Sequence, residues 1–309
     1  MKVLGVFEDP ACRGWFFAIG NFDGVHLGHR AMLAQLRKRA NAAGAPAVVL
    51  TFEPHPIAIL RPAQAPALLT TLERKLELLE AAGVDCTIAY PTDRALLDLS
   101  ARAFFDDIIA GRLATRGLVE GTNFQFGKGR AGTVDLLRDW CRTAGIACDI
   151  LPPVSVDNRL VSSSEIRGAI ARGDVAEAAL LLGAPYRISG TVVRGESRGA
   201  SIGFPTANLD RVATLLPAHG VYAGRARCDD GWFAAAINLG PNPTFGEAAR
   251  KFEAHLLDYA GNLYGQHVEV EFVAWLRNTQ AFAGVEHLIE QLKKDVARTQ
   301  ALVNGALDG

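Results

Sequence analysis

The feature that most constrains this chain is the stretch 16–30, which reads FFAIGNFDGVHLGHR. Its apolar run, Phe16 to Ile19, predicts a buried strand, and the apolar spacing that follows predicts a helix over 29–42. Gly20 and Gly24 permit a tight loop between them. A strand, a glycine loop and a helix direct free backbone N–H groups and the positive end of the helix dipole at one place, which favours a bound anion.

Two histidines, His26 and His29, stand on either side of Gly28 where the loop meets the helix. They are placed to add hydrogen-bond donors or positive charge to the same anion, and the glycine between them lets a ligand approach the backbone. A phosphate is the natural candidate, carried by a nucleoside triphosphate. The alternative is structural, with one histidine capping the helix and the other in solvent. The strand–loop–helix context favours the phosphate site.

Length and charge narrow the class of protein. A chain of 309 residues has room for two domains, each with its own core. An apolar fraction of 49% with 21% charged residues is typical of a globular protein. A net charge of −1 leaves no global basic field to attract nucleic acid or an anionic membrane, and we expect neither as a partner.

The cysteines and the N-terminus predict a cytoplasmic protein. Five scattered cysteines form no CxxC motif and no disulfide framework, which favours a reduced compartment. The first residues have no apolar segment of the kind found in signal peptides. No apolar run approaches the length that would span a bilayer.

The first half of the chain alternates apolar runs with amphipathic stretches. Strands are predicted at 16–19, 48–52, 86–89, 118–120 and 147–151, and helices at 29–42, 72–82, 103–111 and 134–144. Three of these helices are followed by a glycine suited to end a helix, at Gly44, Gly83 and Gly145. This alternation predicts a parallel sheet with helices on its faces, and ligands then collect beyond the carboxyl ends of the strands.

Two loops after predicted strands carry unusual residues. In Glu53-Pro54-His55-Pro56 the two prolines stiffen the loop that carries His55, which suits a wall for a flat ligand. The alternative there is a plain connection with a surface histidine. Residues 121–130 (GTNFQFGKGR) offer glycines, a basic pair and two aromatic rings for phosphate and ring binding. Alternatively their aromatics fold back onto the core, and the residues alone leave both alternatives open.

A helix start supplies a further candidate anion site. Ser162 followed three residues later by Glu165 is a capping box, so a helix begins here. Ser163, Ser164 and Arg167 then surround its N-terminus, which suits a triphosphate. The structural alternative is a helix cap and nothing more.

After Gly183 the pattern changes to short alternating runs. Strands are predicted at 188–193, 221–228, 232–238, 252–259 and 268–276, and a helical pattern returns over 282–296. Within the last strand, Val268, Val270, Phe272, Ala274 and Leu276 are expected to share one face. These elements predict an antiparallel sheet or small barrel with a terminal helix. We therefore expect two domains, 1–185 and 186–309.

Two sites stand out in the second half. Thr206 and Asn208 place hard oxygen donors two residues apart, which suits Mg²⁺ that also holds substrate phosphates. Upstream, Gly195, Gly199 and Gly203 make a loop able to fold over those phosphates. Glu253 and His255 share the polar face of a strand, where a carboxylate is a candidate general base. An ordinary turn and a solvated strand face are the respective alternatives.

Several of these segments resemble one known family. GNFDGVHLGH resembles the HxGH signature of the nucleotidyltransferase superfamily and, in full, the prokaryotic bifunctional riboflavin kinase/FMN adenylyltransferase (FAD synthetase) family. TFEPHP, the GTNFQFG loop and the SSSEIR helix start are similar to further segments of that family. In the second half GFPTAN, PAHGVY, the Asn238…PTF segment and EAHLLD resemble its flavokinase domain.

The resemblance implies a Rossmann-like α/β nucleotidyltransferase domain followed by a small antiparallel β-barrel flavokinase domain with a C-terminal helix. It implies that the second domain phosphorylates riboflavin to FMN with ATP, and that the first adenylylates FMN to FAD with release of pyrophosphate. Carried over on matching positions, Thr206 and Asn208 would hold Mg²⁺ and Glu253 would act as the base. His26, His29 and Arg167 would stabilise charge during adenylyl transfer.

The implied binding residues form three groups. ATP in the first domain is assigned to Gly20, Phe22, Asp23, Gly24, His26, Gly28, His29, Ser163, Ser164 and Arg167. ATP in the second domain is assigned to the loop with Gly195, Gly199 and Gly203. The flavin of the adenylylation reaction is assigned to Phe52, Pro54, His55, Asn123 and Phe126.

One departure from the family pattern leaves an alternative open. The family loop usually has an arginine after its second glycine, whereas here Ala200 follows Gly199 and Arg198 precedes it. Either Arg198 substitutes, or the chain keeps only one activity, the adenylyltransferase. A second alternative is a nucleic-acid-binding barrel, which requires a basic, aromatic-lined face. Glu269 and Glu271 on the predicted strands disfavour it.

Overall fold

A computed structural model describes residues 1–5, 13–196, 198–241 and 251–307. The chain divides by its internal contacts into two units. The first unit holds residues 1–67 and 71–162, and the second holds 68–70 and 163–309. The domain boundary expected near residue 185 from the change of sequence pattern stays a prediction.

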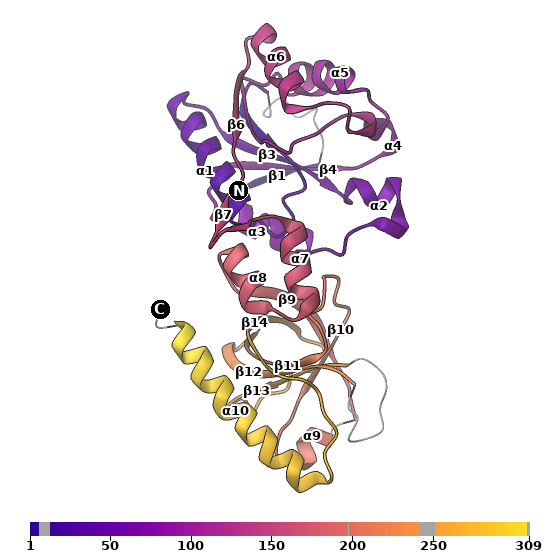
Figure 1. Cartoon of the computed structure of the whole chain (residues 1–309), viewed down its shortest axis with the longest axis vertical. Coiled ribbons are helices and arrows are strands. Elements are labelled where there is room, and N and C mark those ends of the chain that lie inside the picture. Colours follow the sequence, from indigo (N-terminus) through magenta and orange to yellow (C-terminus); the bar gives the residue numbers. More distant parts are fainter. Residues whose placement is uncertain (6–12, 197, 242–250, 308–309) are drawn as a thin grey trace. The chain divides into compact units, whose positions relative to one another are not determined.

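The first unit is built on a parallel sheet, as the sequence predicted, but with six strands where five were expected, because the three-residue β1 was missed. The strands lie in the order β1-β4-β3-β2-β5-β6 (Figure 1). Their bounds are β1 Lys2–Leu4, β2 Phe16–Ile19, β3 Ala47–Glu53, β4 Cys86–Pro91, β5 Gly117–Gly121 and β6 Ala147–Leu151. The chain steps from β2 to β3 to β4 in one direction and then crosses to β5 on the other side of β2. The strand order therefore reverses between β2 and β5, where α/β sheets bind ligands.

The helices of this unit are α1 Leu27–Ala42, α2 Pro56–Leu60, α3 Leu72–Ala81, α4 Arg94–Leu97, α5 Ala101–Ala103 and α6 Val134–Ala144. The unit also has short 3₁₀ turns at Pro62–Gln64 and Lys128–Arg130 and a small hairpin of β7 Ser155–Val156 with β8 Arg159–Leu160. Two apolar clusters join several of these helices to the sheet. One cluster joins α1 and α3 to the sheet through Leu33, Leu36 and Leu79. The other packs Phe104, Phe105, Leu137 and Cys141 against Phe17, Leu50 and Ile88.

The helix predicted over 103–111 is a π-helix, Phe104–Arg112, continuous with α5. Its wider turn is visible where the N–H of Leu113 donates to the carbonyl of Ile108, five residues back. Gly111 fits this turn because an added Cβ would lie 2.9 Å from the carbonyl oxygen of Asp106. Periodicity predicts the helix here but not its wider turn.

The second unit contains a closed antiparallel barrel in the strand order β10-β13-β12-β11-β14-β9. The strands are β9 Tyr186–Val193, β10 Ala207–Asp210, β11 Gly220–Cys228, β12 Gly231–Gly240, β13 Lys251–Leu256 and β14 His267–Arg277. The sequence predicted five of them and missed β10, because four residues are too short to show a clear alternation. The helices are α7 Ser163–Arg172, α8 Val175–Leu182, the one-turn α9 Arg198–Ser201 and α10 Val285–Leu307.

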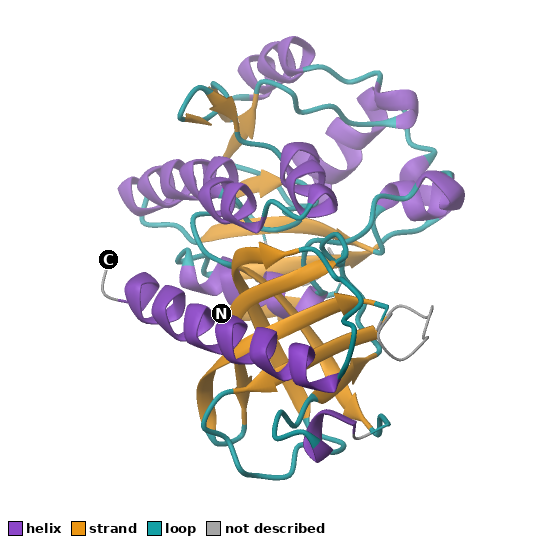
Figure 2. Cartoon of the chain, turned by 60° about the horizontal axis from the view of Figure 1, so that its bottom comes forward, coloured by secondary structure: helices purple, strands orange, loops and turns teal. Residues whose placement is uncertain are grey.

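The terminal helix α10 lies across the outer face of the barrel (Figure 2). Its Leu302 packs on Val221, Ala223 and Leu276. Within the described part of the chain, no helix has both the length and the apolar character needed to cross a membrane.

Aromatic rings fill the barrel interior, and one prediction about β14 is wrong. Phe272 contacts the rings of Tyr186, Tyr222 and Phe252. The pairing of β11 with β14 shifts between Ala223 and Gly224, so the alternation expected to continue to Leu276 breaks there. Leu276 packs instead with α10. A β-bulge adds one residue and moves the later side chains to the opposite face.

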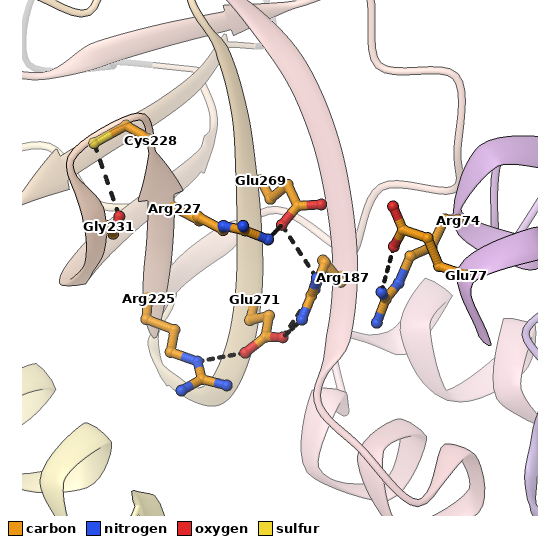
Figure 3. Close-up of polar contacts among 9 residues, drawn as sticks. All are labelled: Arg74, Glu77, Arg187, Arg225, Arg227, Cys228, Gly231, Glu269 and Glu271. Carbon is orange, nitrogen blue, oxygen red and sulfur yellow. Dashed lines mark hydrogen bonds and ion pairs between the residues drawn. The ribbon is translucent and has the colours of Figure 1, made fainter. Parts of the chain in front are cut away.

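A charged ladder runs over the outer face of β9, β14 and β11 (Figure 3). Arg187 donates to Glu271 across 2.9 Å from Nε, and Arg225 pairs with the other carboxylate oxygen. Glu269 pairs with Arg187 and with Arg227 at 3.1 and 3.6 Å. The guanidiniums of Arg187 and Arg225 also lie 5.0 and 4.5 Å from the ring centre of Trp232. This face does combine arginines with an aromatic ring, but Glu269 and Glu271 pair with all three arginines and offset most of their charge, so it is a poor surface for nucleic acid.

Candidate active sites

One row of side chains crosses the outer face of the barrel. Neighbouring strands place Asn208 beside Glu253, Glu253 beside Asn238, Asn238 beside Val221, and Val221 beside Arg277. The amide nitrogen of Asn238 lies 3.4 Å from a carboxylate oxygen of Glu253. Residues that are far apart in sequence thus form a short polar strip, with the carboxylate at its centre.

This strip forms one wall of a hollow with a cavity volume of about 150 Å³. The lining includes charged and polar residues: Arg198, Thr206, Asn208, Asn238, Lys251, Glu253, His255, Arg277 and Asp295. It also includes apolar residues: Ile202, Phe204, Val221 and Ile237, together with Phe282 and the α10 residues Leu288, Leu292 and Val296. A polar group next to an apolar wall suits a ligand with a flat apolar body and a charged or hydroxylated end.

The glycine-rich segment that precedes Thr206 and Asn208 packs closely against both residues. A Cβ added to Gly195 would lie 2.3 Å from the amide nitrogen of Asn208. A Cβ added to Gly199 would lie 2.3 Å from the carbonyl oxygen of Phe204 and 3.5 Å from the hydroxyl of Thr206. Side chains at either glycine would fill the space beside the two oxygen donors. Glycine is therefore required at 195 and 199 because other residues approach the backbone closely there, whether or not the loop also moves.

Two further contacts fix the walls of the hollow. Nδ1 of His255 lies 2.7 Å from the carbonyl oxygen of Pro205, so the ring donates a hydrogen bond to the segment that carries Thr206. Arg277, at the end of the row, makes a bidentate ion pair with Asp295 of α10, with its closest contact at 2.7 Å. Asp295 is 4% exposed, so this pair is largely buried.

In the first unit, the loop after β2 holds the two histidines face to face. Phe22, Gly24 and Val25 have positive φ angles of 49°, 83° and 40°, which turn the chain sharply before α1. His26 caps α1: its Nδ1 accepts the backbone N–H of His29 at 3.3 Å. The two imidazole rings stack with centroids 3.6 Å apart. The structural alternative is therefore right about the cap, whereas the second histidine is stacked on the first and only partly exposed.

The absence of a side chain at Gly28 leaves room for the ring of His26. A Cβ at Gly28 would lie 3.2 Å from the ring of His26 and 3.6 Å from the carbonyl oxygen of Val161. Some of the space that the sequence reserved for a ligand is thus taken by His26 itself. Phe22 is 2% exposed and its ring lies 5.0 Å from that of His29, so it supports the histidine from behind.

His29 is kept neutral by its surroundings. Burial, and then the neighbouring His26 and Lys75, hold the pKa of His29 well below its usual value of 6.5. Its Nδ1 is buried and has no hydrogen-bond partner among the described residues. Lys75 of α3 is itself only 4% exposed and lies 3.7 Å from a carboxylate oxygen of Glu53. A neutral imidazole with a free ring nitrogen, next to a buried ammonium, is suited to hydrogen-bond an anion.

A second hollow, with a cavity volume of about 360 Å³, opens in the same unit. Its lining combines the strand ends Ile19 and Phe52 with Leu60 and Arg61 after β3 and with Phe124, Phe126 and Arg130 of the loop after β5. Phe126 is 5% exposed and packs against Phe104 and Trp140. The aromatics of this loop therefore fold onto the core, as the structural alternative expected, and they also line the hollow. Binding of a ring or a phosphate by this loop stays a prediction.

Comparisons with known proteins match both units. A family model described as FAD synthetase matches residues 9–165, and one described as riboflavin kinase matches residues 182–303. The bifunctional riboflavin kinase/FMN adenylyltransferases of Haemophilus influenzae and Pseudomonas fluorescens are each 38% identical. The alignments cover 94% and 95% of this chain and 95% and 94% of those relatives. The chain belongs to the bifunctional riboflavin kinase/FMN adenylyltransferase family.

A solved structure from Streptococcus pneumoniae, described as a macrolide-efflux protein, is also similar. It is 29% identical with a TM-score of 0.86, and the match covers 97% of this chain and 99% of that one. The likeness supports the fold seen here. The recognition of the family from short motifs is confirmed, as is the predicted pair of architectures.

In the riboflavin kinase half of this family member, the predicted residues come together. Thr206, Asn208 and Glu253 line one hollow with Gly199, and Gly195 abuts Asn208. Gly203 does not line it, and its φ of 87° marks a turn. Arg198 lines the hollow whereas Ala200 does not, which favours Arg198 as the substitute for the arginine missing after Gly199. The PTF segment predicted at 243–245 lies outside the described residues.

In the FMN adenylyltransferase half, only some of the residues predicted to bind the flavin line the hollow. Phe52 and Phe126 line the hollow of about 360 Å³, whereas Pro54, His55 and Asn123 do not. His55 instead joins two loops: Nδ1 accepts the N–H of Ile57 at 3.1 Å, and Nε2 lies 2.9 Å from the side-chain amide of Asn21. The roles of these residues stay predictions.

The predicted ATP residues of the adenylyltransferase lie in two segments, the loop before α1 with the first turn of that helix, and the start of α7. Gly20, Asp23 and Gly24 belong to the loop before α1, and Asp23 is 4% exposed. Ser163, Ser164 and Arg167 lie in the first turns of α7, in the second unit. Their part in binding ATP stays a prediction carried by the SSSEIR motif.

Sequence reasoning missed four charged residues at these sites: Lys75, Lys251, Arg277 and Asp295. Lys251 could have been found, because strand alternation places it on the face of Glu253 and His255. The pair of Arg277 with Asp295 joins a strand to a helix and leaves no pattern in the sequence. Lys75 is an isolated lysine in an amphipathic helix, where burial is not expected.

Proposed function

We propose that this protein makes FAD from riboflavin in two ATP-dependent steps. The barrel transfers the γ-phosphoryl group of ATP to the 5′-hydroxyl of riboflavin, giving FMN. The α/β unit then catalyses attack of the FMN phosphate on the α-phosphorus of a second ATP, giving FAD and pyrophosphate. The observation that carries the proposal is the row of Asn208, Glu253 and Asn238 in a hollow lined by both polar and apolar side chains, in a chain that matches both family models.

In the kinase step Glu253 takes the proton of the riboflavin hydroxyl. The carboxylate is central in the strip and fixed on a strand, and the amide of Asn238 orients it from 3.4 Å. The apolar wall from α10 and Phe282 receives the ring system of the flavin. Arg198 and Lys251 are placed to balance the charge of the ATP phosphates.

The oxygens of Thr206 and Asn208 fit Mg²⁺, which takes few protein ligands when it also holds phosphates. The glycine at position 195 supports this assignment, because any other side chain there would occupy the space beside the amide of Asn208. Bound there, the ion would neutralise charge on the transferred phosphoryl group. Thr206, Asn208 and the glycine segment would hold the phosphates in line with the hydroxyl.

In the adenylylation step the loop before α1 receives the phosphates of ATP. Backbone N–H groups at the start of α1 and the unpartnered nitrogen of His29 are hydrogen-bonding groups there. Because His29 is neutral, it acts as a hydrogen-bonding group, and the cationic contribution falls to Lys75 and to Arg167 of the SSSEIR motif. Phe52 and Phe126 offer faces on which the flavin ring stacks.

The test is incubation of the protein with riboflavin and Mg-ATP, with FMN and FAD separated by chromatography. We expect both products. Glu253→Ala should stop FMN formation from riboflavin while FMN is still converted to FAD, and His29→Ala should do the reverse. Formation of FAD from FMN with no FMN from riboflavin in the unchanged protein would leave only the adenylyltransferase. In that case Ala200→Arg should restore the kinase.

The setting of this activity is also a proposal. Cys141, Cys148 and Cys228 are free thiols among the described residues, and two of them, Cys141 and Cys228, are buried. A reducing compartment such as the cytoplasm fits these thiols. The substrates we propose are small molecules, and no partner macromolecule is needed for either step.

A further inference from the structure

A buried glutamate joins the two strands between which the sheet reverses its order. The carboxylate of Glu120 on β5 accepts the backbone N–H of Ile19 on β2 at 2.7 Å. Glu120 is 1% exposed. Main-chain pairing of these strands is limited to Phe16 with Gly117 and Phe17 with Leu118, so at Ile19 a side chain takes over from the ladder.

The position of this contact matters for the site. Parallel strands on either side of a reversal separate toward their carboxyl ends, and the crevice that results is where ligands bind. The loop with the two histidines begins directly after Ile19, and the loop with Phe124 and Phe126 begins directly after β5. Ile19 itself lines the hollow assigned above to the flavin. The bond from Glu120 therefore lies at the base of both loops.

The surroundings keep the glutamate uncharged. Burial raises the pKa of Glu120 well above its usual value, although the hydrogen bond from Ile19 opposes the shift and Cys148 adds to it. The groups that face it are the thiols of Cys148 on β6 and Cys141 on α6. No basic side chain is among the causes of the shift. A neutral carboxyl can still accept the hydrogen bond from Ile19, and the free-energy cost of burying it is far lower than that of burying a carboxylate.

We propose that Glu120 is a positioning residue for FMN adenylylation, which sets the spacing of β2 and β5 through its bond to Ile19. This rests on the function proposed above for the α/β unit. Loss of the acceptor leaves a buried N–H unpaired and lets the two strand ends shift, and both the flavin wall and the histidine loop move with them. Glu120 does not take part in the chemistry.

The experiment compares three variants at this position in the full-length protein. Glu120→Gln keeps an oxygen acceptor of the same length, Glu120→Leu removes the acceptor, and Glu120→Asp withdraws it by one methylene. The readouts are KM for FMN and kcat of FAD formation from FMN, and the affinity for FMN alone from quenching of flavin fluorescence. Phosphorylation of riboflavin by the same preparations is the internal control.

We expect Glu120→Gln to stay within about twofold of the unchanged protein. Glu120→Leu and Glu120→Asp should lower kcat/KM for FMN by roughly tenfold to a hundredfold, mainly through KM, with riboflavin phosphorylation unaffected. If Glu120→Leu does not fold, Glu120→Asp decides, since it retains a polar group at the site.

Normal KM and FMN affinity in Glu120→Asp and Glu120→Leu would overturn the inference. So would an equal loss in Glu120→Gln, because the acceptor would then not be what matters. Absence of FAD formation in the unchanged protein would contradict the proposed function instead, and the two failures are thus distinct.

Discussion

The ring of His255 donates its Nδ1–H to the carbonyl oxygen of Pro205 across 2.7 Å. This bond joins the strand that carries Glu253 to the segment that carries Thr206. The ring of Phe204 meets His255 edge-on at 5.5 Å and restricts its rotation. The proposed base and the proposed Mg²⁺ ligands are thereby linked by one side chain that need not touch either substrate.

The first prediction follows from that bond. In His255→Asn the amide nitrogen can take the place of Nδ1, so we expect kcat/KM of riboflavin phosphorylation to stay within about threefold. His255→Leu removes the donor, and we expect a loss of about tenfold, which corresponds to about 1.4 kcal/mol in the transition state. Steady-state kinetics with varied Mg-ATP measure both, and FAD formation from FMN serves as the control. Equal activity of the Asn and Leu variants would contradict the role of the hydrogen bond.

The second prediction concerns the ion pair of Arg277 with Asp295. Removing one partner of a buried pair leaves the other charge without compensation, at a cost of about 3–5 kcal/mol. Asp295→Ala should therefore loosen α10 and raise KM for riboflavin, because that helix supplies the apolar wall. Hydrogen exchange of the α10 amides measures the loosening.

Two variants sharpen this test. Arg227→Ala removes a partner from an exposed pair, in which Arg227 lies 3.6 Å from Glu269 and its side chain is 56% exposed, and we expect an effect below about 1 kcal/mol. The double variant Arg277→Met with Asp295→Leu removes both charges and should recover much of the protection of α10. Protection unchanged in Asp295→Ala would show that the pair does not hold the helix.

Some features of the kinase site can be predicted from the sequence and others cannot. Alternation along a strand has a period of two, so Glu253 and His255 could be placed on one face from the sequence alone. That Asn208 and Asn238 lie on either side of Glu253 depends on strand register, which local patterns do not contain. The short strand β10 was missed because its four residues show too little alternation.

The errors have local causes as well. The bulge beside Ala223 leaves no mark in the apolar pattern, because the extra residue on β14, Val273, is itself apolar. His29 was expected to help carry positive charge, but its burial against His26 and Lys75 depends on three elements meeting. Spacing predicted where the two histidines lie, whereas the charge of His29 depends on packing that the spacing does not contain.

The third prediction tests that charge state. His29 should remain neutral well below pH 6.5 in an NMR titration, since its pKa is lowered by burial and by His26 and Lys75. Lys75→Met removes one of these causes, and we expect the pKa of His29 to rise toward its usual value. Lys38→Met, at an exposed site on α1, is the matched control and should not change it.

The sign of the effect on stability follows from the lowered pKa. The unfolded chain takes up a proton on His29 near pH 6.5 and the folded protein does not, so the stability contributed by this group is present above pH 6.5 and is lost as the pH falls below it. A His29 resonance that titrates at or above 6.5 would contradict the buried, neutral assignment.

The last prediction concerns Glu120, whose pKa is shifted in the opposite direction. The folded protein keeps the proton that the unfolded chain loses near pH 4.5, so the stability from this group is full below 4.5 and is lost as the pH rises toward the native pKa. Glu120→Gln does not titrate and keeps the acceptor for Ile19. It should match the unchanged protein at pH 4.5 and exceed it at pH 8, by about 1.4 kcal/mol for each pH unit between the two pKa values. Urea unfolding followed by the fluorescence of Trp15 and Trp140, which both lie in the first unit, measures the difference. Glu73→Gln, at an exposed carboxylate of α3, is the control, and a difference between Glu120→Gln and the unchanged protein that does not vary with pH would show that Glu120 is charged in the folded state.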